Sequence, residues 1–232
     1  MESSPDRPFS ARLSQVEQRI ARACAAAGRS REDITLMAVT KTHPLERIAE
    51  AVAAGLLTLG ENRVQEAKTK IEQAPFSAQW ELIGQLQSNK AKLAAALFAR
   101  IQSVDREKLV LKLDEEGQQR GLPVRILMQV NTSEEAQKSG VRPEHAPALA
   151  TCITQCPGLQ WEGLMTIGPL EGGREAARQS FILLREIRDQ LRQTTGLPLP
   201  VLSMGMTGDL EEAIQEGSTL IRIGTALFAP RP

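Results

Sequence analysis

The sequence predicts a single (β/α)8 barrel, a TIM barrel, with one extra helix ahead of the first strand. Its 232 residues lie close to the roughly 250 that are typical of this fold, and no change in composition marks a linker or a second domain. Short apolar runs alternate with longer amphipathic stretches, as strands alternate with helices in a barrel. The runs match the number of strands that the fold needs and cover 34–39, 56–59, 80–83, 100–104, 124–130, 159–165, 200–204 and 219–223.

The helices follow from apolar spacing and from residues typical of helix ends. Apolar residues recur every three or four positions from Phe9 onward, which predicts the extra helix. Residues 1–8 are polar and proline-rich, so we expect a flexible end followed by one domain over 9–232. Asp209 is expected to cap the helix after the seventh strand together with Glu212. The other helices are expected to begin near Pro44, Glu61, Asn89, Asp105, Arg142 and Gly173.

A doubly wound open sheet is the alternative for a chain in which strands and helices alternate. That fold usually has five or six strands and carries a glycine-rich turn after the first one. Here the first turn reads KTHP (41–44) and contains no glycine. The barrel is therefore the fold that we predict.

The composition argues against several classes of partner. The formal net charge is +0, whereas surfaces that bind nucleic acid or acidic membranes are basic. No apolar run approaches the ~20 residues of a membrane-spanning helix, and the beginning of the chain lacks the apolar segment of a secretory leader. The 3 cysteines show neither disulfide-framework nor metal-site spacing. We therefore expect a cytoplasmic protein without a metal, a nucleic-acid partner or a membrane partner.

Functional residues in this fold follow the carboxyl ends of the strands, so those positions define the candidate site. They are Lys41, Gly60, Glu61, Asn62, 84–90, Asn131, Met165, Thr166, Ser203, Met204, Gly205, Arg222, Gly224 and Thr225.

Two cationic residues in this set suggest a ligand. Lys41 follows an apolar strand, where desolvation would lower the pKa of its amine, and a neutral amine attacks an aldehyde. The alternative is a lysine that only extends to water. Arg222 interrupts the apolar strand TLIRI (219–223). A buried guanidinium needs an acceptor, which is either a ligand atom such as a heteroaromatic nitrogen or an internal carboxylate such as Glu61.

The loops after the seventh and eighth strands form a phosphate site in many TIM barrels. The hydroxyls of Ser203 and Thr225 can donate to an anion, and residues 225–228 can form a short helix that offers free N–H groups. Tight turns and helix capping are the alternative explanation for the same residues. Together with Lys41 and Arg222, this set fits a phosphorylated aldehyde that contains a ring nitrogen.

Seven stretches carry a resemblance to a known family. They are AVTKTHP (38–44), GENRVQEA (60–67), IGQLQSNK (83–90), VNTSEEAQKSG (130–140), GLMTIGP (163–169), LSMGMTGDLEEAI (202–214) and IRIGTALF (221–228). They occur in this order over nearly the whole chain and are jointly specific. On these motifs the chain resembles the pyridoxal phosphate homeostasis proteins (the YggS/PROSC family), which are relatives of the N-terminal barrel of alanine racemase.

The resemblance implies pyridoxal 5'-phosphate (PLP) as the cofactor. By position, Lys41 corresponds to the lysine that forms the aldimine, Arg222 to the partner of the pyridine nitrogen, and Asn62 to a residue beside the ring. The implied phosphate cradle comprises Ser203, Gly224 and Thr225, with the backbone of Met204 and Gly205 nearby. The chain departs from the family pattern at Arg63, where tyrosine is common, and at His43, where lysine is common.

The resemblance also implies a role in PLP (vitamin B6) and amino-acid homeostasis without catalysis, with apo PLP-enzymes as candidate partners. The alternative is a PLP-dependent amino-acid racemase. Alanine racemases use a second base, a tyrosine from an additional domain, and this chain has 0 tyrosines. An aldolase-type barrel would use a Schiff-base lysine without an aldehyde cofactor. We expect a monomer with no catalytic residue.

Overall fold

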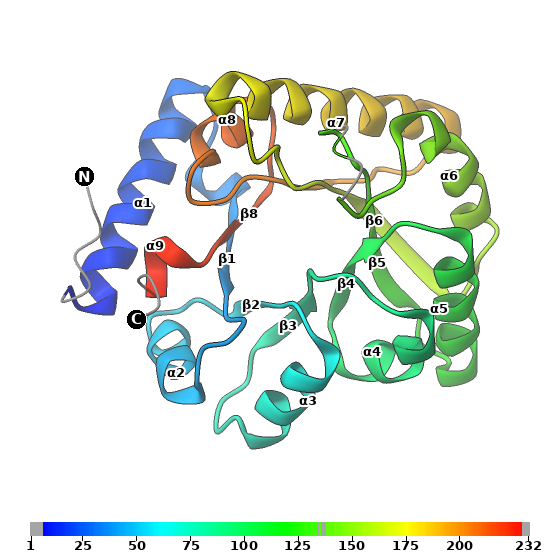
Figure 1. Cartoon of the computed structure of the whole chain (residues 1–232), viewed down its shortest axis with the longest axis horizontal. Coiled ribbons are helices and arrows are strands. Elements are labelled where there is room, and N and C mark those ends of the chain that lie inside the picture. Colours follow the sequence, from blue (N-terminus) through cyan, green and yellow to red (C-terminus); the bar gives the residue numbers. More distant parts are fainter. Residues whose placement is uncertain (1–6, 134, 136–137, 229–232) are drawn as a thin grey trace.

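The computed structural model describes residues 7–133, 135 and 138–228, and this part of the chain forms a closed barrel of parallel strands surrounded by helices (Figure 1). Each strand pairs with its sequence neighbours, and the first strand closes the barrel against the last. The strands are β1 (Thr35–Val39), β2 (Thr58–Glu61), β3 (Gln79–Leu82), β4 (Arg100–Val104), β5 (Val124–Gln129), β6 (Leu159–Met165), β7 (Val201–Ser203) and β8 (Leu220–Ile223). The predicted fold is therefore confirmed.

Helices connect the strands on the outside of the barrel. They are α1 (Phe9–Ala26), α2 (Leu45–Ala53), α3 (Val64–Gln73), α4 (Ala91–Leu97), α5 (Glu107–Arg120), α6 (Ala146–Thr154), α7 (Gly173–Thr195), α8 (Leu210–Gln215) and α9 (Thr225–Phe228). Gly121 and Gly196 end α5 and α7 in the left-handed conformation, which glycine adopts without steric cost. The extra helix α1 begins at Phe9, as its apolar spacing predicts.

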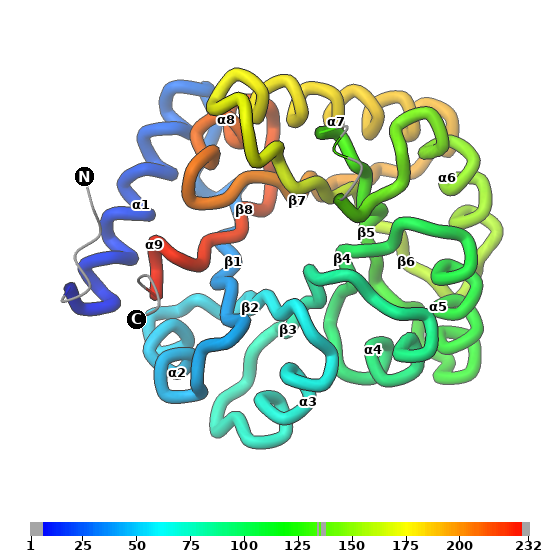
Figure 2. Tube along the Cα trace, in the orientation of Figure 1, coloured from blue at the N-terminus to red at the C-terminus, as the bar shows by residue number. Residues whose placement is uncertain are grey.

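The first and last helices lie side by side at the closure of the barrel (Figure 2). The rings of Phe9 and Phe228 lie 5.6 Å apart. Arg12 is buried, and its Nε donates to the carbonyl of Leu227 at 2.6 Å. Helix α1 also contacts α8. These contacts cover the outer side of the barrel next to β8 and so support the strand that carries Arg222.

Two local expectations are wrong. Asp209 does stand at the start of α8, but its carboxylate accepts the N–H of Met206 at 2.6 Å instead of capping the helix. Glu212 forms an ion pair with Arg174 of α7 instead of closing a capping box, because α7 packs against α8. The tertiary contact thus replaces the local one.

Two absences follow from the described residues. No described helix has the length and apolar character to cross a membrane. No group of three or more His, Cys, Asp or Glu side chains in residues 7–133, 135 and 138–228 could hold a metal ion.

Candidate functional site

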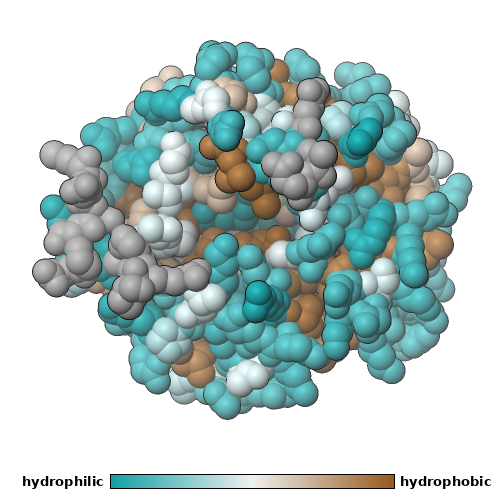
Figure 3. Space-filling model, viewed as in Figure 1, coloured by the Kyte–Doolittle hydropathy of each residue, from teal (hydrophilic) through white to brown (hydrophobic). Residues whose placement is uncertain are grey.

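A cavity of about 260 Å³ opens at the carboxyl ends of the strands. Small-molecule sites usually occupy roughly 300–1,000 Å³, so the cavity suits a compact ligand. Its lining comprises Val39, Lys41, Asn62, Ile83, Gly84, Gln85, Gln129, Val130, Asn131, Lys138, Ser139, Thr166, Ile167, Met206 and Arg222. Figure 3 shows apolar side chains gathered toward the middle of the viewed face and polar side chains around its rim.

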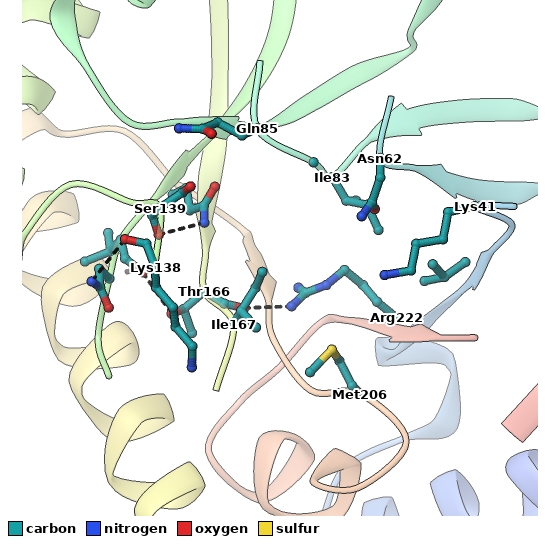
Figure 4. A pocket seen from close by; sticks show the side chains of 15 residues that line it. Lys41, Asn62, Ile83, Gln85, Lys138, Ser139, Thr166, Ile167, Met206 and Arg222 are labelled. Atoms are coloured by element: carbon teal, nitrogen blue, oxygen red, sulfur yellow. Dashed lines mark hydrogen bonds between the residues drawn. The ribbon is translucent and has the colours of Figure 1, made fainter. Parts of the chain in front are cut away.

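Lys41, Asn62 and Arg222 share this cavity, although they come from three different strand ends. Figure 4 shows the Lys41 side chain extending toward Arg222, with Asn62 beside both. Lys41 and Asn62 are half-buried. The structure therefore brings together the expected amine, the expected ring neighbour and the expected guanidinium.

Arg222 is 4% exposed, and its recorded hydrogen-bond partners among the described residues are both neutral. Its Nη1 donates to the hydroxyl of Ser203 at 2.6 Å, and its Nη2 donates to the carbonyl of Thr166 at 2.7 Å. Burial lowers the pKa of the Arg222 guanidinium to about 10, which still leaves it charged at neutral pH. Asp209 acts on this cation only through its charge, without a recorded hydrogen bond. A buried cation that is not hydrogen-bonded to a carboxylate calls for an additional acceptor, and the cavity lies beside it.

The internal salt bridge to Glu61 considered from the sequence is absent from the described structure. Glu61 is fully buried on the other side of its strand, where its Oε1 lies 2.7 Å from Nζ of Lys70. Successive residues of a strand point to opposite faces, so Glu61 faces α3 whereas Asn62 faces the cavity. Arg222 is thus left without this carboxylate.

The interior of the barrel contains a chain of hydrogen bonds behind Arg222. The Ser203 hydroxyl accepts from Arg222 and donates to Oε1 of Gln102 at 2.6 Å. Nε2 of Gln102 donates to Glu81 at 2.6 Å, and Arg100 binds Glu81 through two nitrogens at 2.7 and 2.9 Å. Each hydrogen-bond direction in the chain is fixed, because arginine can only donate and the ionised carboxylate can only accept.

Ser203 therefore has a different environment from the one that a phosphate donor needs. Its side chain is fully buried, and its oxygen already accepts one hydrogen bond and donates another. The reason is strand alternation: Ser203 is the last residue of β7 and faces the barrel interior, while the loop begins after it. The arrangement assigns Ser203 to Arg222 and lends no support to the predicted contact with a phosphate.

The other residues of the expected phosphate cradle lie at the ends of β7 and β8, outside the cavity lining. Met204 is fully buried, and its N–H donates to the carbonyl of Leu220 at 3.1 Å, within the barrel ladder. Gly205 has φ +94°, and a Cβ there would lie 2.5 Å from the Cβ of Ala213. Gly224 is half-buried and Thr225 is exposed at the start of α9.

Several lining residues received no specific role from the sequence. Asn131 and Thr166 stood among the strand-end positions, so their position was a usable signal. Gln129 and Lys138 gave no such signal, because their place depends on the pairing of Val141 with Val130 next to the end of β5. Nε2 of Gln129 donates to the carbonyl of Ser139 at 2.9 Å. Nζ of Lys138 donates to the carbonyl of Gly168 at 2.6 Å and pairs with Glu135.

The two positions that depart from the family pattern lie outside the cavity lining. Arg63 is exposed just before α3. The ring of the half-buried His43 stacks on that of Phe228 with centroids 4.5 Å apart. His145, the second histidine, is exposed.

Comparison with known proteins agrees with this geometry. Residues 12–232 match the family model for the alanine racemase N-terminal domain. A pyridoxal phosphate homeostasis protein from Vibrio cholerae is 44% identical over 209 residues, which cover 88% of each chain. The structure of PipY from Synechococcus elongatus with PLP bound matches with a TM-score of 0.81 and 35% identity, covering 92% of this chain and 99% of PipY.

A more distant comparison concerns the fold alone. An alanine racemase structure from Clostridium difficile has a TM-score of 0.77 at 13% identity, and the match covers 97% of this chain but 57% of the racemase. The two curated and structural relatives above match over nearly their whole length instead. The chain belongs to the family of pyridoxal phosphate homeostasis proteins, which share their barrel with the N-terminal domain of alanine racemase.

Proposed function

We propose that this protein binds PLP through a Schiff base on Lys41 and acts in PLP and amino-acid homeostasis without catalytic turnover. The observation that carries the proposal is the position of Lys41 next to a buried guanidinium whose described hydrogen-bond partners are both neutral. A pyridine nitrogen would supply the missing acceptor for Arg222. The PLP-bound structure of PipY supports the same ligand class.

The residues present fit this cofactor. When bound, PLP supplies an aldehyde for the lysine amine, a pyridine nitrogen and a phosphate dianion. Lys41 would hold it covalently, Arg222 would donate to the ring nitrogen, and Asn62 would lie beside the ring. The half-buried Gly224 and the exposed Thr225 lie where α9 begins and would hold the phosphate.

The groups that could move protons in the cavity support the proposed absence of turnover. Arg222 can only donate, so it keeps a pyridine nitrogen unprotonated and weakens the ring as an electron sink. A racemase needs a second base, and the chain has 0 tyrosines. Lys138 is the other lysine in the lining, but its Nζ is already held by the Gly168 carbonyl and by Glu135 instead of being directed at a ligand.

The test of the lysine uses borohydride reduction and peptide mass spectrometry. Reduction of the PLP complex should place the adduct on Lys41, and Lys41→Ala should abolish the visible absorption band. Lys138→Ala should retain that band, because Lys138 shares the cavity without forming the bond. An adduct mainly on Lys138 would overturn the assignment.

The compartment, the oligomeric state and the partners of the protein belong to the same proposal. Its 3 cysteines are free thiols, which suits the reducing cytoplasm. We propose a monomer, and a stable dimer in light scattering at micromolar concentration would contradict this. Apo PLP-enzymes are the proposed partners. Transfer of PLP to an apo-enzyme faster than release into buffer would support delivery, whereas equal rates would favour buffering.

A further inference from the structure

The main chain next to Lys41 adopts an unusual conformation. Thr42 has φ 64°, in the left-handed region. This region is unfavourable for a β-branched residue, so surrounding contacts must stabilise it. Leu199 is the only other non-glycine residue of the described chain with positive φ. The unfavourable conformation thus lies directly after the lysine that points into the cavity.

Side chains of β2 and α3 hold the backbone on both sides of Lys41. The N–H of Thr42 donates to Oε1 of Glu66 at 2.6 Å. The carbonyl of Thr40 accepts from Nζ of Lys70 at 2.8 Å, and the Thr40 hydroxyl donates to Oε1 of Glu61 at 2.6 Å. The residue before Lys41 and the residue after it are therefore both fixed by charged groups.

These charged groups form one cluster, which we call the Lys70 triad: Glu61, Glu66 and Lys70. Nζ of Lys70 lies 2.7 Å from Glu61 and 2.8 Å from Glu66. Lys70 is 9% exposed, and Oε2 of the fully buried Glu61 has no partner among the described residues. Burial raises the pKa of Glu61, whereas hydrogen bonds from Lys70 and Thr42 lower the pKa of Glu66 against the opposing effect of burial.

A buried ion cluster with an unsatisfied oxygen contributes little to stability compared with an apolar replacement. The same helix carries an exposed ion pair, Lys68–Glu72 at 3.6 Å, which has no recorded contact with residues 40–42. The buried cluster thus differs from the exposed Lys68–Glu72 pair in its contacts with residues 40–42. This indicates a positional role for the buried one.

We propose that Glu66 and Lys70 are positioning residues that fix the backbone of residues 40–42, so that the Lys41 amine points into the cavity before the ligand arrives. The proposal rests on the proposed function, since it concerns the same lysine. Its consequence is kinetic: loss of the anchor lets the segment leave the left-handed conformation, and the amine then spends less time in a reactive orientation. A misplacement of about 1 Å can slow a reaction about 10²-fold.

Glu66→Leu tests the anchor, because it removes the acceptor of the Thr42 N–H at a half-buried position. The rate of formation of the borohydride-reducible adduct with PLP should fall roughly 10- to 100-fold. Glu66→Gln should restore most of this rate, because its amide oxygen can still accept the N–H. Glu72→Leu, further along α3, is the matched control and should behave like the wild type.

A second readout separates positioning from general damage. The analogue 4'-deoxypyridoxine 5'-phosphate has no aldehyde, so its affinity does not depend on the lysine bond. Its dissociation constant should change less than about twofold in Glu66→Leu if the cavity is intact. The double variant Lys70→Met with Glu61→Gln removes both buried charges together. It should also slow formation of the adduct and leave the dissociation constant of the analogue nearly unchanged.

Three results would decide the matter. An adduct rate in Glu66→Leu equal to that in Glu72→Leu would overturn the proposal. Parallel loss of adduct rate and analogue affinity would also overturn it, because that pattern indicates a disturbed cavity. Failure of the proposed function is recognised separately, since the wild type itself would then form no adduct on Lys41.

Discussion

Replacing Ser203 with alanine distinguishes a partner of Arg222 from a phosphate donor. The structure places the Ser203 oxygen between Nη1 of Arg222 and Oε1 of Gln102, at 2.6 Å from each. The substitution removes both hydrogen bonds without adding volume. It leaves a buried guanidinium nitrogen and a buried amide oxygen without this partner, in a barrel interior where Ser203 itself is fully buried.

The expected loss in the free energy of unfolding follows from these two bonds. A hydrogen bond to a charged group contributes roughly 1.5–3 kcal/mol and a neutral one roughly 0.5–1.5 kcal/mol. The two together give about 2–4.5 kcal/mol for Ser203→Ala, measured by urea denaturation. Ser218→Ala is the control, because Ser218 is equally buried but donates only to backbone carbonyls. It should lose about 1 kcal/mol.

Binding of PLP and of pyridoxal, which lacks the phosphate, completes the assay. If Ser203 acts through Arg222, the affinities for both ligands should fall by a similar factor, because both contain the pyridine ring. If Ser203 donates to the phosphate, only PLP binding should weaken. A selective loss of PLP affinity of tenfold or more, with a stability loss below about 1 kcal/mol, would refute the reasoning.

Three further predictions concern other parts of the molecule. Arg100→Met should lower the free energy of unfolding by about 3–5 kcal/mol, because it leaves the buried Glu81 carboxylate unpaired. Arg125→Met should lower the free energy of unfolding by less than about 1 kcal/mol, because the Arg125 side chain is 40% exposed and Glu162 still pairs with Arg100. Equal losses for Arg100→Met and Arg125→Met in urea denaturation would contradict this. Burial raises the pKa of the Cys156 thiol to about 11, so iodoacetamide should modify it slowly at pH 7 in the native protein and faster as the pH rises; peptide mass spectrometry showing rapid native modification would oppose that expectation. L- and D-alanine in deuterated water should show no multiple-turnover α-proton exchange by NMR, whereas Lys41-dependent turnover would establish the racemase alternative.

The sequence by itself determined the fold and the positions from which the site is built. Eight apolar runs separated by amphipathic stretches correspond to eight strands in sequential order, because parallel strands buried on both faces must be apolar and short. The strand-end rule also selected Lys41, Asn62 and Arg222, since a closed parallel barrel brings all carboxyl strand ends to one mouth. These features depend on local periodicity, which a single chain displays directly.

Only the tertiary structure decided which partner each polar group has. Ser203 pairs with Arg222 and Gln102, which lies 101 positions away in the sequence. Glu61 pairs with Lys70 instead of Arg222, and Glu212 pairs with Arg174 instead of capping its own helix. The physical reason is that hydrogen bonds between side chains depend on distances of a few ångströms across the barrel, and those distances are set by packing that no local pattern records.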